Sequence, residues 1–395
     1  MKTFSEESVR FIQEHLQDDV NKLLLQGKRF SHLPVSDLVL QIQARQKAKS
    51  KLPNWFSKEK IVFPPMISLE QCSSEATAAY KAGTIEGEVL IDLTGGMGVD
   101  ISAMAMRFKQ AIHLEQNQEL SEITAYNFRQ LGINNVAFYA QNSIDFLQNY
   151  PQRADWIYLD PARRDHSGGK VFRLQDCEPN ILEISDLLFE KSENILLKTS
   201  PMLDIDLAVS DLQHVYKIAV VALENEVKEV LFYLRKGFIG EAEKTAVNIL
   251  KNNRIEEFSF TKSLETGTYI NYSQPSKFLY EPNVAILKAG AFKIIAQKFK
   301  VQKLQANSHL YTSEALVPDF PGRVFEIEAV CKLDKKEILK YLPDKKANIT
   351  TRNFPLTVKQ IRDKIGISDG GSVFLFATTD QFNQKIILIC KKLVF

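Results

Sequence analysis

The sequence predicts an α/β protein with a doubly wound, mostly parallel sheet that ends in an antiparallel strand. A helical region precedes this sheet, and a small α+β domain follows it. Three observations lead to the prediction. The apolar run Val89–Ile91 ends in Asp92 and passes through a glycine-rich turn into a helical pattern. Short apolar strands and helices then alternate, as they do in a parallel sheet. Beyond Lys236 this alternation changes to a different pattern of strands, turns and short helices.

The composition excludes several classes of protein. The chain has 395 residues, 45% of them hydrophobic, and can bury the cores of two or three domains. No apolar run approaches about 18 residues, so we expect no transmembrane helix. The N-terminal stretch is acidic where a secretory signal would be apolar. The four cysteines are scattered without a metal-binding spacing, and we therefore expect a cytoplasmic protein with no metal site.

Changes of pattern along the chain predict four parts. Residues 1–80 form a helical region, 81–240 the sheet domain, 241–323 a β-rich or α+β connecting part, and 324–395 a small α+β domain. The end of the chain is basic, because Cys331 to Phe395 holds 13 Lys and Arg against six Asp and Glu. A basic module on a mildly acidic body indicates a nucleic-acid partner, and a solvated basic face is an equal alternative.

Two segments before the sheet domain each allow two interpretations. The segment Arg45–Lys60 is basic and contains Trp55 and Phe56. It can track a phosphate backbone and stack on bases, or it can end a helix and pack its aromatic residues on the next domain, which we favour. Ser74 and Glu75 begin a helix just upstream of the glycine-rich turn, at the lip of a pocket or simply as a helix cap.

Each further element follows from its local pattern. In the sheet domain we expect strands over Ala111–Leu114, Val136–Tyr139, Trp156–Leu159 and Ile195–Leu197, and helices over Leu120–Leu131, Ile144–Leu147 and Ile181–Phe189. The runs Val215–Leu223 and Val227–Leu234 flank a turn and predict an antiparallel hairpin at one edge of the sheet. The last domain should have the order β-α-α-β-β, with the elements Val324–Val330, Leu333–Leu342, Phe354–Ile365, Val373–Ala377 and Ile386–Ile389.

Polar residues that follow the strands should converge, because ligands bind beyond the carboxyl ends of strands in such a sheet. Glu115 lies 20 residues after Gly95, at the end of the next strand. A carboxylate there can accept hydrogen bonds from both hydroxyls of a ribose. The glycines do not fit the G-x-G-x-x-G of dinucleotide enzymes, and the GK[ST] of a P-loop is absent. The residues that converge are Asp92–Gly98, Glu115, Asn142, Asp160–Arg164 and Lys198–Pro201.

The segment Asp92–Asp100, DLTGGMGVD, resembles motif I of the class I S-adenosylmethionine-dependent methyltransferases, which have a Rossmann-like sheet. The resemblance covers about Leu90–Arg235 and includes the antiparallel last strand. It implies S-adenosyl-L-methionine as the cofactor, with Glu115 at the ribose position and Asn142 near the adenine. The cofactor-binding residues that it implies are Asp92, Thr94, Gly95, Gly96, Gly98, Glu115, Gln116, Asn142, Ser143 and Asp160.

The stretch Tyr158–Asp165, YLDPARRD, stands at motif IV of this family. Amino-group methyltransferases carry [DN]-P-P-[YFW] there, and the second proline and the aromatic residue are missing here. Asp-Pro-Ala-Arg is similar to the uracil-C5 RNA methyltransferases, but these need a cysteine nucleophile after the following strand, where Lys198–Pro201 has none. We therefore predict direct methyl transfer to a base nitrogen or another nucleophile, with the catalytic residues Asp160, Pro161 and Arg163.

The predicted roles around motif IV differ from residue to residue. Asp160 can accept a hydrogen bond or a proton from the acceptor. Arg163 and Arg164 either clamp a phosphate or pair with nearby aspartates, and both alternatives stay open. We expect Arg164 and Lys198 on the substrate side, and the loop 166–170 beside the site as a candidate lid.

The helical N-terminal part, the SSEATA before motif I, the DPARRD at motif IV and the basic tail are together similar to a group of bacterial class I methyltransferases with a THUMP-like C-terminal domain. THUMP domains bind RNA, so this resemblance implies rRNA or tRNA as substrate, with Arg352, Lys359 and Arg362 as contacts. Two alternatives stay open. One is a methyltransferase of a small molecule or a protein, and the other is a non-catalytic RNA-binding protein that retains the fold. The oligomeric state stays open as well.

Overall fold

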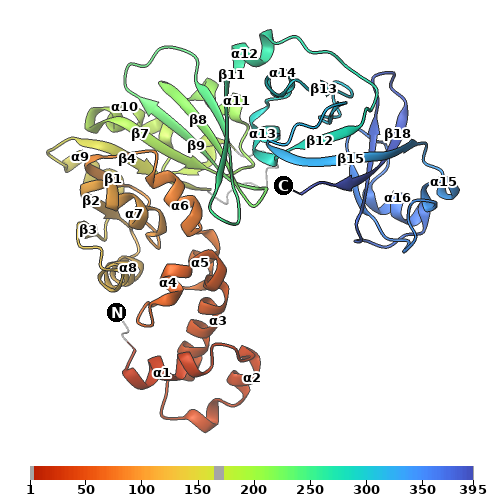
Figure 1. Cartoon of the computed structure of the whole chain (residues 1–395). Coiled ribbons are helices and arrows are strands. Elements are labelled where there is room, and N and C mark those ends of the chain that lie inside the picture. Colours follow the sequence, from red (N-terminus) through yellow and green to blue (C-terminus); the bar gives the residue numbers. More distant parts are fainter. Residues whose placement is uncertain (1–3, 164–172, 395) are drawn as a thin grey trace. The chain divides into compact units, whose positions relative to one another are not determined.

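The computed structural model describes residues 4–163 and 173–394. The chain divides into two compact units, Met1–Lys217 with Glu229–Gly240, and Ile218–Lys228 with Glu241–Phe395. The division therefore falls within a β-hairpin made by β8 (Val215–Leu223) and β9 (Glu226–Arg235). Figure 1 shows the elements of both units in chain order.

Helices fill the N-terminal part of the first unit, as the sequence predicts (Figure 1). The side chains of Ser5 and Asp19 accept hydrogen bonds from backbone N–H groups and so begin two of these helices. Phe11, Leu23 and Leu38 pack into a small apolar core among the first helices. The helices are α1 (Glu6–Glu14), α2 (Val20–Leu25), the 3-10 turn η1 (Gly27–Phe30), α3 (Val35–Lys51), α4 (Pro53–Ser57), α5 (Met66–Gln71) and α6 (Glu75–Ala82).

The sheet of the first unit has the strand order β9-β7-β4-β1-β2-β3. All neighbours in it are parallel except β7 and β9, which confirms the antiparallel last strand. In register, Leu90 of β1 lies between Ala111 of β2 and Trp156 of β4. The strands are β1 (Gly87–Asp92), β2 (Phe108–Leu114), β3 (Val136–Tyr139), β4 (Ala154–Leu159), β7 (Ser192–Thr199) and β9.

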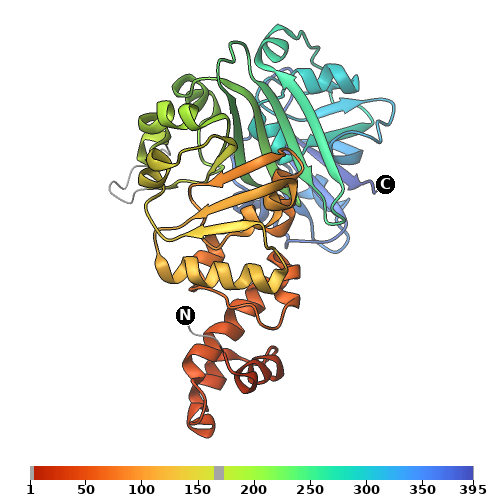
Figure 2. The same ribbon diagram turned by 90° about the vertical axis from the view of Figure 1, so that its left-hand side faces the viewer.

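The connecting helices carry their own start and stop signals. Asn117 caps the first turn of α8, and Gly132 ends this helix in a left-handed conformation with φ of 77°. Asn142 and Asn180 cap the helices that begin at Ser143 and Ile181 in the same way. Figure 2 shows α8 alongside the strands β1 to β3. The helices are α7 (Val99–Met104), η2 (Ala105–Arg107), α8 (Gln118–Leu131), α9 (Ser143–Asn149), η3 (Leu174–Asp176), α10 (Ile181–Lys191) and α11 (Ile205–Asp211).

The second unit departs from the sequence prediction at the hairpin. Strand β10 (Glu243–Ile249) is hydrogen-bonded to β8, and β11 (Ile255–Thr261) pairs antiparallel with β10. The predicted position of the hairpin at a sheet edge is therefore wrong. The run from 243 to 249 is half polar by sequence, and only its pairing reveals it as a strand.

A second sheet in this unit has the order β13-β14-β12-β15-β18-β17-β16. The last domain has an additional strand, β16, so its order is β-α-β-α-β-β and the predicted order was incomplete. Across the described residues, no helix is both long and apolar enough to cross a membrane. The remaining elements are α12 (Lys262–Gly267), β12 (Phe278–Pro282), α13 (Val284–Ala289), α14 (Ile294–Phe299), β13 (Gln302–Lys303), β14 (Tyr311–Ser313), β15 (Gly322–Cys331), α15 (Lys335–Leu339), β16 (Asn348–Thr351), α16 (Val358–Ile365), β17 (Val373–Thr379) and β18 (Lys385–Lys392).

Candidate active site

The glycine-rich turn between β1 and α7 is fitted closely to the protein beneath it. A Cβ atom on Gly95 would lie 2.3 Å from Nε2 of His113, and one on Gly98 would lie 2.7 Å from Cγ2 of Thr124. Both distances are too short for a real contact. Gly96 differs, because a Cβ there meets nothing closer than a backbone oxygen at 3.9 Å; its φ of +52°, like the +81° of Gly98, is in the left-handed region. Packing therefore demands Gly95 and Gly98, whereas Gly96 presents open backbone to the space beyond the sheet.

Glu115 at the end of β2 is held by this turn. Its Oε2 accepts the N–H of Gly96 at 3.1 Å, and its Oε1 accepts the N–H of Asn117 at 2.8 Å. The side chain is half-buried. Each carboxylate oxygen has further lone pairs, so Glu115 is oriented and can still accept hydrogen bonds from a ligand.

A pocket of about 600 Å³ opens at the carboxyl ends of β1, β2, β3 and β4. It brings together all the residues that the sequence comparison implied for cofactor binding. The Oδ1 atom of Asn142 already accepts hydrogen bonds from the N–H groups of Ile144 and Asp145 at the start of α9. The predicted residues that line the pocket are Asp92, Thr94, Gly95, Gly96, Gly98, Glu115, Gln116, Asn142, Ser143 and Asp160.

Asp160 follows β4 and faces the same pocket. Its backbone N–H donates to Oγ1 of Thr94 at 2.6 Å, and its Oδ2 accepts Nζ of Lys198 at 2.5 Å. Lys198 comes from β7, as strand-end convergence predicted, but it does not line the pocket. It stands behind Asp160 with only 10% of its side chain exposed, against 35% for Asp160. Lys198 is therefore placed to orient Asp160.

Other parts of motif IV are placed only in part. Pro161 is buried and precedes β5 (Ala162–Arg163), which pairs with β6 (Cys177–Glu178) in a two-stranded ladder. The side chain of Arg163, all of Arg164 and the loop 166–170 lie outside the described residues. Cys177 is 1% exposed and is not among the residues that line the pocket, in keeping with a structural thiol.

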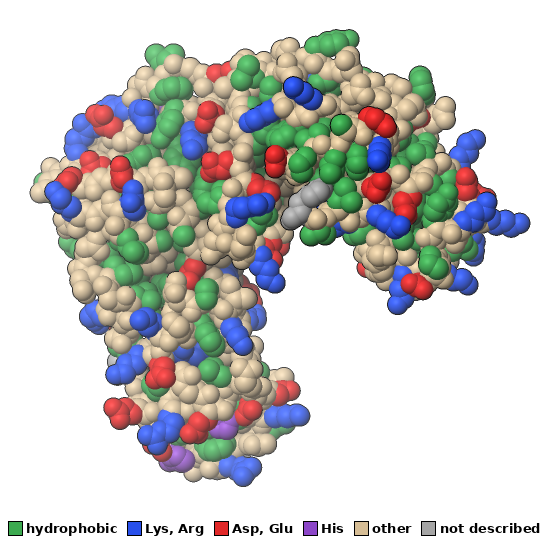
Figure 3. Space-filling model, viewed as in Figure 1, with side chains coloured by type: hydrophobic (Ala, Val, Ile, Leu, Met, Phe, Trp, Pro, Cys, Tyr) green, Lys and Arg blue, Asp and Glu red, His purple; other side chains and the backbone are tan. Residues whose placement is uncertain are grey.

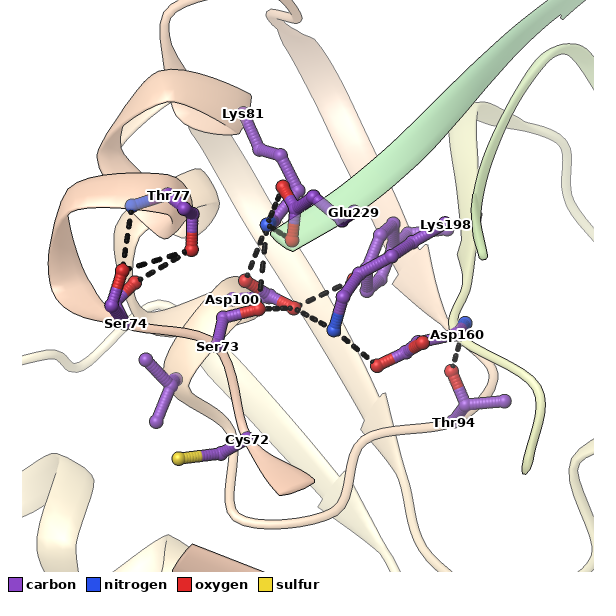
Figure 4. A network of polar contacts seen from close by, with 12 residues as sticks. Cys72, Ser73, Ser74, Thr77, Lys81, Thr94, Asp100, Asp160, Lys198 and Glu229 are labelled. Carbon is purple, nitrogen blue, oxygen red and sulfur yellow. Dashed lines mark hydrogen bonds and ion pairs between the residues drawn. The ribbon is translucent and has the colours of Figure 1, made fainter. Parts of the chain in front are cut away.

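Behind the pocket lies a network of buried charges that the sequence did not indicate as a unit (Figure 4). Nζ of Lys81 in α6 lies 2.5 and 2.7 Å from the carboxylate oxygens of Glu229 in β9, and 3.1 Å from Oδ1 of Asp100. Oδ2 of Asp100 accepts the hydroxyl of Tyr158 at 2.6 Å and lies 3.5 Å from Nζ of Lys198. The two lysines and their carboxylates thus form one continuous set.

Electrostatics within this set are unusual because water is excluded. Burial alone would raise the pKa of Asp100, but the ammonium groups of Lys81 and Lys198 hold it below its usual range. Burial alone would lower the pKa of Lys198, but the carboxylates of Asp160, Asp100 and Glu229 raise it above the ordinary value. Burial also raises the pKa of Glu229 and, more strongly, that of Asp92. Lys198 and Asp100 therefore stay charged at neutral pH.

The missed residues did leave faint signals in the sequence. Lys81 stands on the apolar face of a short Ala-rich helix, and Glu229 directly precedes the apolar run of β9. A charge in such a position is rarely left unpaired, so each one indicates a partner without naming it. Among the described residues, no group of three or more His, Cys, Asp or Glu side chains is arranged to hold a metal ion.

The segment Arg45–Lys60 packs its tryptophan on the sheet domain, which is the interpretation that the sequence favours. Trp55 is 2% exposed and contacts the ring of Phe128 edge to face. Arg45 is buried and donates to backbone carbonyls, including that of Ile61 at 2.7 Å. Burial lowers the pKa of Arg45 to about 10. These two side chains serve packing and not RNA contact.

Three neighbouring residues connect this segment to the pocket. Ser73 donates to Oδ2 of Asp100 at 2.8 Å, and Ser74 accepts the N–H of Thr77 to begin α6. Glu75 accepts two N–H groups at the start of α4. The pocket itself is lined by Ser73 and the residues before it, so Ser74 and Glu75 are helix caps beside its lip.

The predicted RNA contacts of the last domain fall into two kinds. Arg352 lies 3.0 Å from Oε1 of the buried Glu281, and Arg362 pairs with Asp369. Lys359 on α16 is exposed. Both arginines therefore form ion pairs with carboxylates of their own unit, whereas the side chain of Lys359 is exposed to solvent.

Comparison with known proteins finds two family matches in the C-terminal half of the chain and relatives that cover most of it. Residues 278–321 match a ferredoxin-like domain family, and residues 322–392 match a family described as THUMP domain-like. An uncharacterized S-adenosylmethionine-dependent methyltransferase from Mycobacterium tuberculosis is 21% identical over 275 residues, which cover 70% of this chain and 72% of that protein.

A crystal structure from Porphyromonas gingivalis W83, described as a "putative methyltransferase", is 32% identical and superposes with a TM-score of 0.88 over 100% of both chains. The Gly96 turn, the oriented Glu115 and the pocket between them suit the cofactor of such enzymes. The chain belongs to the same family as the Porphyromonas protein and is an S-adenosylmethionine-dependent methyltransferase.

Proposed function

We propose that this enzyme is a cytoplasmic RNA methyltransferase that acts on rRNA or tRNA by direct transfer, without a covalent bond between enzyme and RNA. The observation that carries the RNA substrate is the THUMP-like match over residues 322–392, on a module with a surplus of basic residues.

The exposed lysines of this module support the proposal. Lys335 and Lys336 begin α15, and Lys359 and Lys364 lie on α16, which packs near α15. All four side chains are exposed. Figure 3 shows Lys and Arg side chains gathered where Figure 1 labels α15. Flexible exposed ammonium groups suit sequence-independent contacts with phosphates. We therefore keep Lys359 as a proposed RNA contact. In place of Arg352 and Arg362 we propose the exposed lysines Lys335, Lys336 and Lys364.

The residues of the pocket fit the cofactor. Gly96 has room above its backbone, and Glu115 would hold the ribose hydroxyls with the lone pairs that its backbone partners leave free. Asp160 and Glu115 place carboxylates in the lining, which suits a ligand that carries a sulfonium and an ammonium group. When bound, S-adenosylmethionine supplies a methyl group that is already activated, so the protein has mainly to orient the acceptor.

Asp160 would perform this orientation from the floor of the pocket. One of its oxygens is bound to Lys198, and the side chain is still 35% exposed, so a carboxylate oxygen can accept a hydrogen bond from the acceptor. A cysteine mechanism is disfavoured. Cys72 lines the pocket, but burial raises the pKa of its thiol, whereas a nucleophile needs a lowered one.

The test is transfer of labelled methyl from S-adenosylmethionine into an extract of cells that lack the gene, separated afterwards into RNA, protein and small molecules. We expect label in RNA with the wild type, none with Glu115→Ala, and wild-type labelling with Lys109→Gln, which removes an exposed lysine paired with Glu88. Label confined to protein or to small molecules would refute the RNA assignment.

A further inference from the structure

An exposed aromatic ring stands at the tip of the hairpin that β17 and β18 form in the last domain (Figure 1). The two strands pair as far as Thr379 and Lys385, and residues 380–384 connect them. Phe382 lies in this connection and is 65% exposed. A single exposed ring is common on protein surfaces, so its surroundings decide whether it marks a binding site.

The backbone that carries Phe382 is fixed by a buried aspartate. Asp380 is 2% exposed, and its Oδ1 accepts the N–H groups of Phe382 at 3.0 Å and of Gln384 at 2.8 Å. Its Oδ2 accepts the side-chain amide of Gln274 at 3.0 Å. The N–H of Asn383 donates to the carbonyl oxygen of Asp380, also at 3.0 Å. A ligand that packs on the ring therefore has little backbone to order, which lowers the entropy cost of binding.

Carboxamide side chains continue the surface from Phe382. Asn383 follows it in the chain, and the Oδ1 of Asn383 accepts the Nε2 of Gln305 at 3.4 Å. The Oε1 of Gln305 accepts the Nδ2 of Asn353 at 2.9 Å. Within the described part of the chain, the Nδ2 of Asn383 and the Oδ1 of Asn353 have no protein partner, and both side chains are exposed. The first can donate to a ligand and the second can accept from one.

The exposed charge at this tip is positive. Lys385 begins β18, is exposed, and donates from its Nζ to the Oγ1 of Thr379 at 2.6 Å. The carboxylate of the loop, that of Asp380, is buried and hydrogen-bonded through both oxygens. The aromatic anchor of a protein interface has a mostly apolar patch around it, whereas amides and an ammonium surround this ring. They suit single-stranded nucleic acid, which needs a face for a base, hydrogen bonds at its edge and a cation for the phosphate.

We propose that Phe382 is a stacking platform for an unpaired base of the RNA substrate, with Asn383 and Asn353 at the edge of that base. This rests on the proposed RNA substrate and specifies which part of the RNA the last domain contacts. Bases inside a duplex stack on one another and offer no face to a side chain, so the ring requires an unpaired nucleotide. The exposed lysines of α15 and α16 can contact the phosphates of paired and unpaired RNA alike. The preference for a single strand therefore comes from the ring.

The test compares a fluorescein-labelled single-stranded oligoribonucleotide with the blunt duplex of the same sequence, each titrated with the full-length protein and followed by anisotropy. Phe382→Ala should weaken binding of the single strand by about fivefold to a hundredfold and leave binding of the duplex unchanged. Because the ring carries no charge, the salt dependence of the affinity should stay as in the wild type. The control Leu264→Ala, which shortens a 54% exposed side chain on α12, should bind both RNAs as the wild type does.

A tryptophan at the same position gives a second measurement. Phe382→Trp keeps a flat aromatic face, and the two native tryptophans, Trp55 and Trp156, are buried. A change in fluorescence on addition of RNA therefore reports on the introduced indole. We expect the single strand to quench this fluorescence and the duplex to leave it unchanged. Both variants should melt as the wild type does, since the ring is exposed.

Three outcomes would overturn the proposal, and they differ in what else they reject. If Phe382→Ala binds the single strand with wild-type affinity while Lys359→Glu weakens it, the platform is wrong and the RNA substrate stands. If the wild type binds neither RNA, the proposed RNA-binding role of the last domain fails as well. If sedimentation shows that the wild type self-associates and that Phe382→Ala abolishes this, the ring belongs to an interface between copies of the chain.

Discussion

Replacing Lys81 by Met tests whether the buried charges behave as one set. Lys81 has no exposed side-chain surface, and Glu229 has 2%. Unit charges about 4 Å apart attract with about 4 kcal/mol at an effective dielectric constant near 20. Removing one partner of a buried pair costs about 3–5 kcal/mol, because the other charge stays buried without compensation. Lys81→Met leaves Glu229 in that state, and we expect the free energy of unfolding to fall by this amount.

The protein offers a selective assay for this change. Its two tryptophans, Trp55 and Trp156, both lie buried in the first unit. Tryptophan fluorescence during denaturant unfolding therefore reports on the unit that contains Lys81 and not on the THUMP-like domain.

A matched control and a double variant make the result decisive. The exposed pair Lys109–Glu88 has the same 2.5 Å separation as Lys81–Glu229, with side chains 78% and 63% exposed. Lys109→Met should cost at most about 1 kcal/mol. Adding Glu229→Gln to Lys81→Met should restore stability, with a coupling energy of about 0.5–3 kcal/mol. If Lys81→Met costs no more than Lys109→Met, or if the two buried substitutions are additive, our account of the network is wrong.

Three further predictions concern the cofactor, pH and the last domain. Glu115→Gln should weaken S-adenosylmethionine binding about tenfold or more in calorimetry, because hydrogen bonds to a charged acceptor contribute about 1.5–3 kcal/mol; undiminished affinity would exclude the ribose role. Burial lowers the pKa of His113 from 6.5 to about 4. The folded-state pKa lies below the unfolded one. The contribution of the neutral His113 to the free energy of unfolding is therefore complete above pH 6.5 and is lost as the pH falls toward 4. Unfolding followed by fluorescence should show a loss of about 3 kcal/mol over that window, and His113→Gln should show a shallower slope. Arg352→Ala should lower the melting temperature, because Glu281 is then left buried with Arg323 as its remaining partner, whereas Lys359→Glu should weaken RNA binding and reduce its salt dependence without a change in melting. The reverse pattern would contradict the assignment of the two residues.

The cofactor side of the site could be predicted because its information is local. The glycines follow a buried strand directly, and Glu115 follows the next one, so the rule that ligands bind at carboxyl ends of strands brings them together. The reason for each glycine was not accessible in this way. Gly95 is required by His113, which the register of β1 against β2 places beneath it.

The charged network could not be predicted, because its members meet only through long-range packing. Lys81 and Glu229 are 148 residues apart, and Glu281 and Arg352 are 71 apart. A sequence shows that a charge exists but not whether a partner neutralises it, so the pairing of Arg352 with Glu281 could not be predicted. Strand β16 was not predicted for a related reason. The residues Asn348–Thr351 are mostly polar and half-buried, and they form a strand only by pairing with β17.

The three contacts of Ser73, Ser74 and Glu75 limit how this enzyme can be recombined with its relatives. These consecutive residues hold α7, α6 and α4 in turn. A crossover placed between the N-terminal helices and the glycine turn would combine contacts from two parents at all three positions. Hybrid enzymes should therefore inherit the segment from α4 through α7 from a single parent, with crossovers outside it.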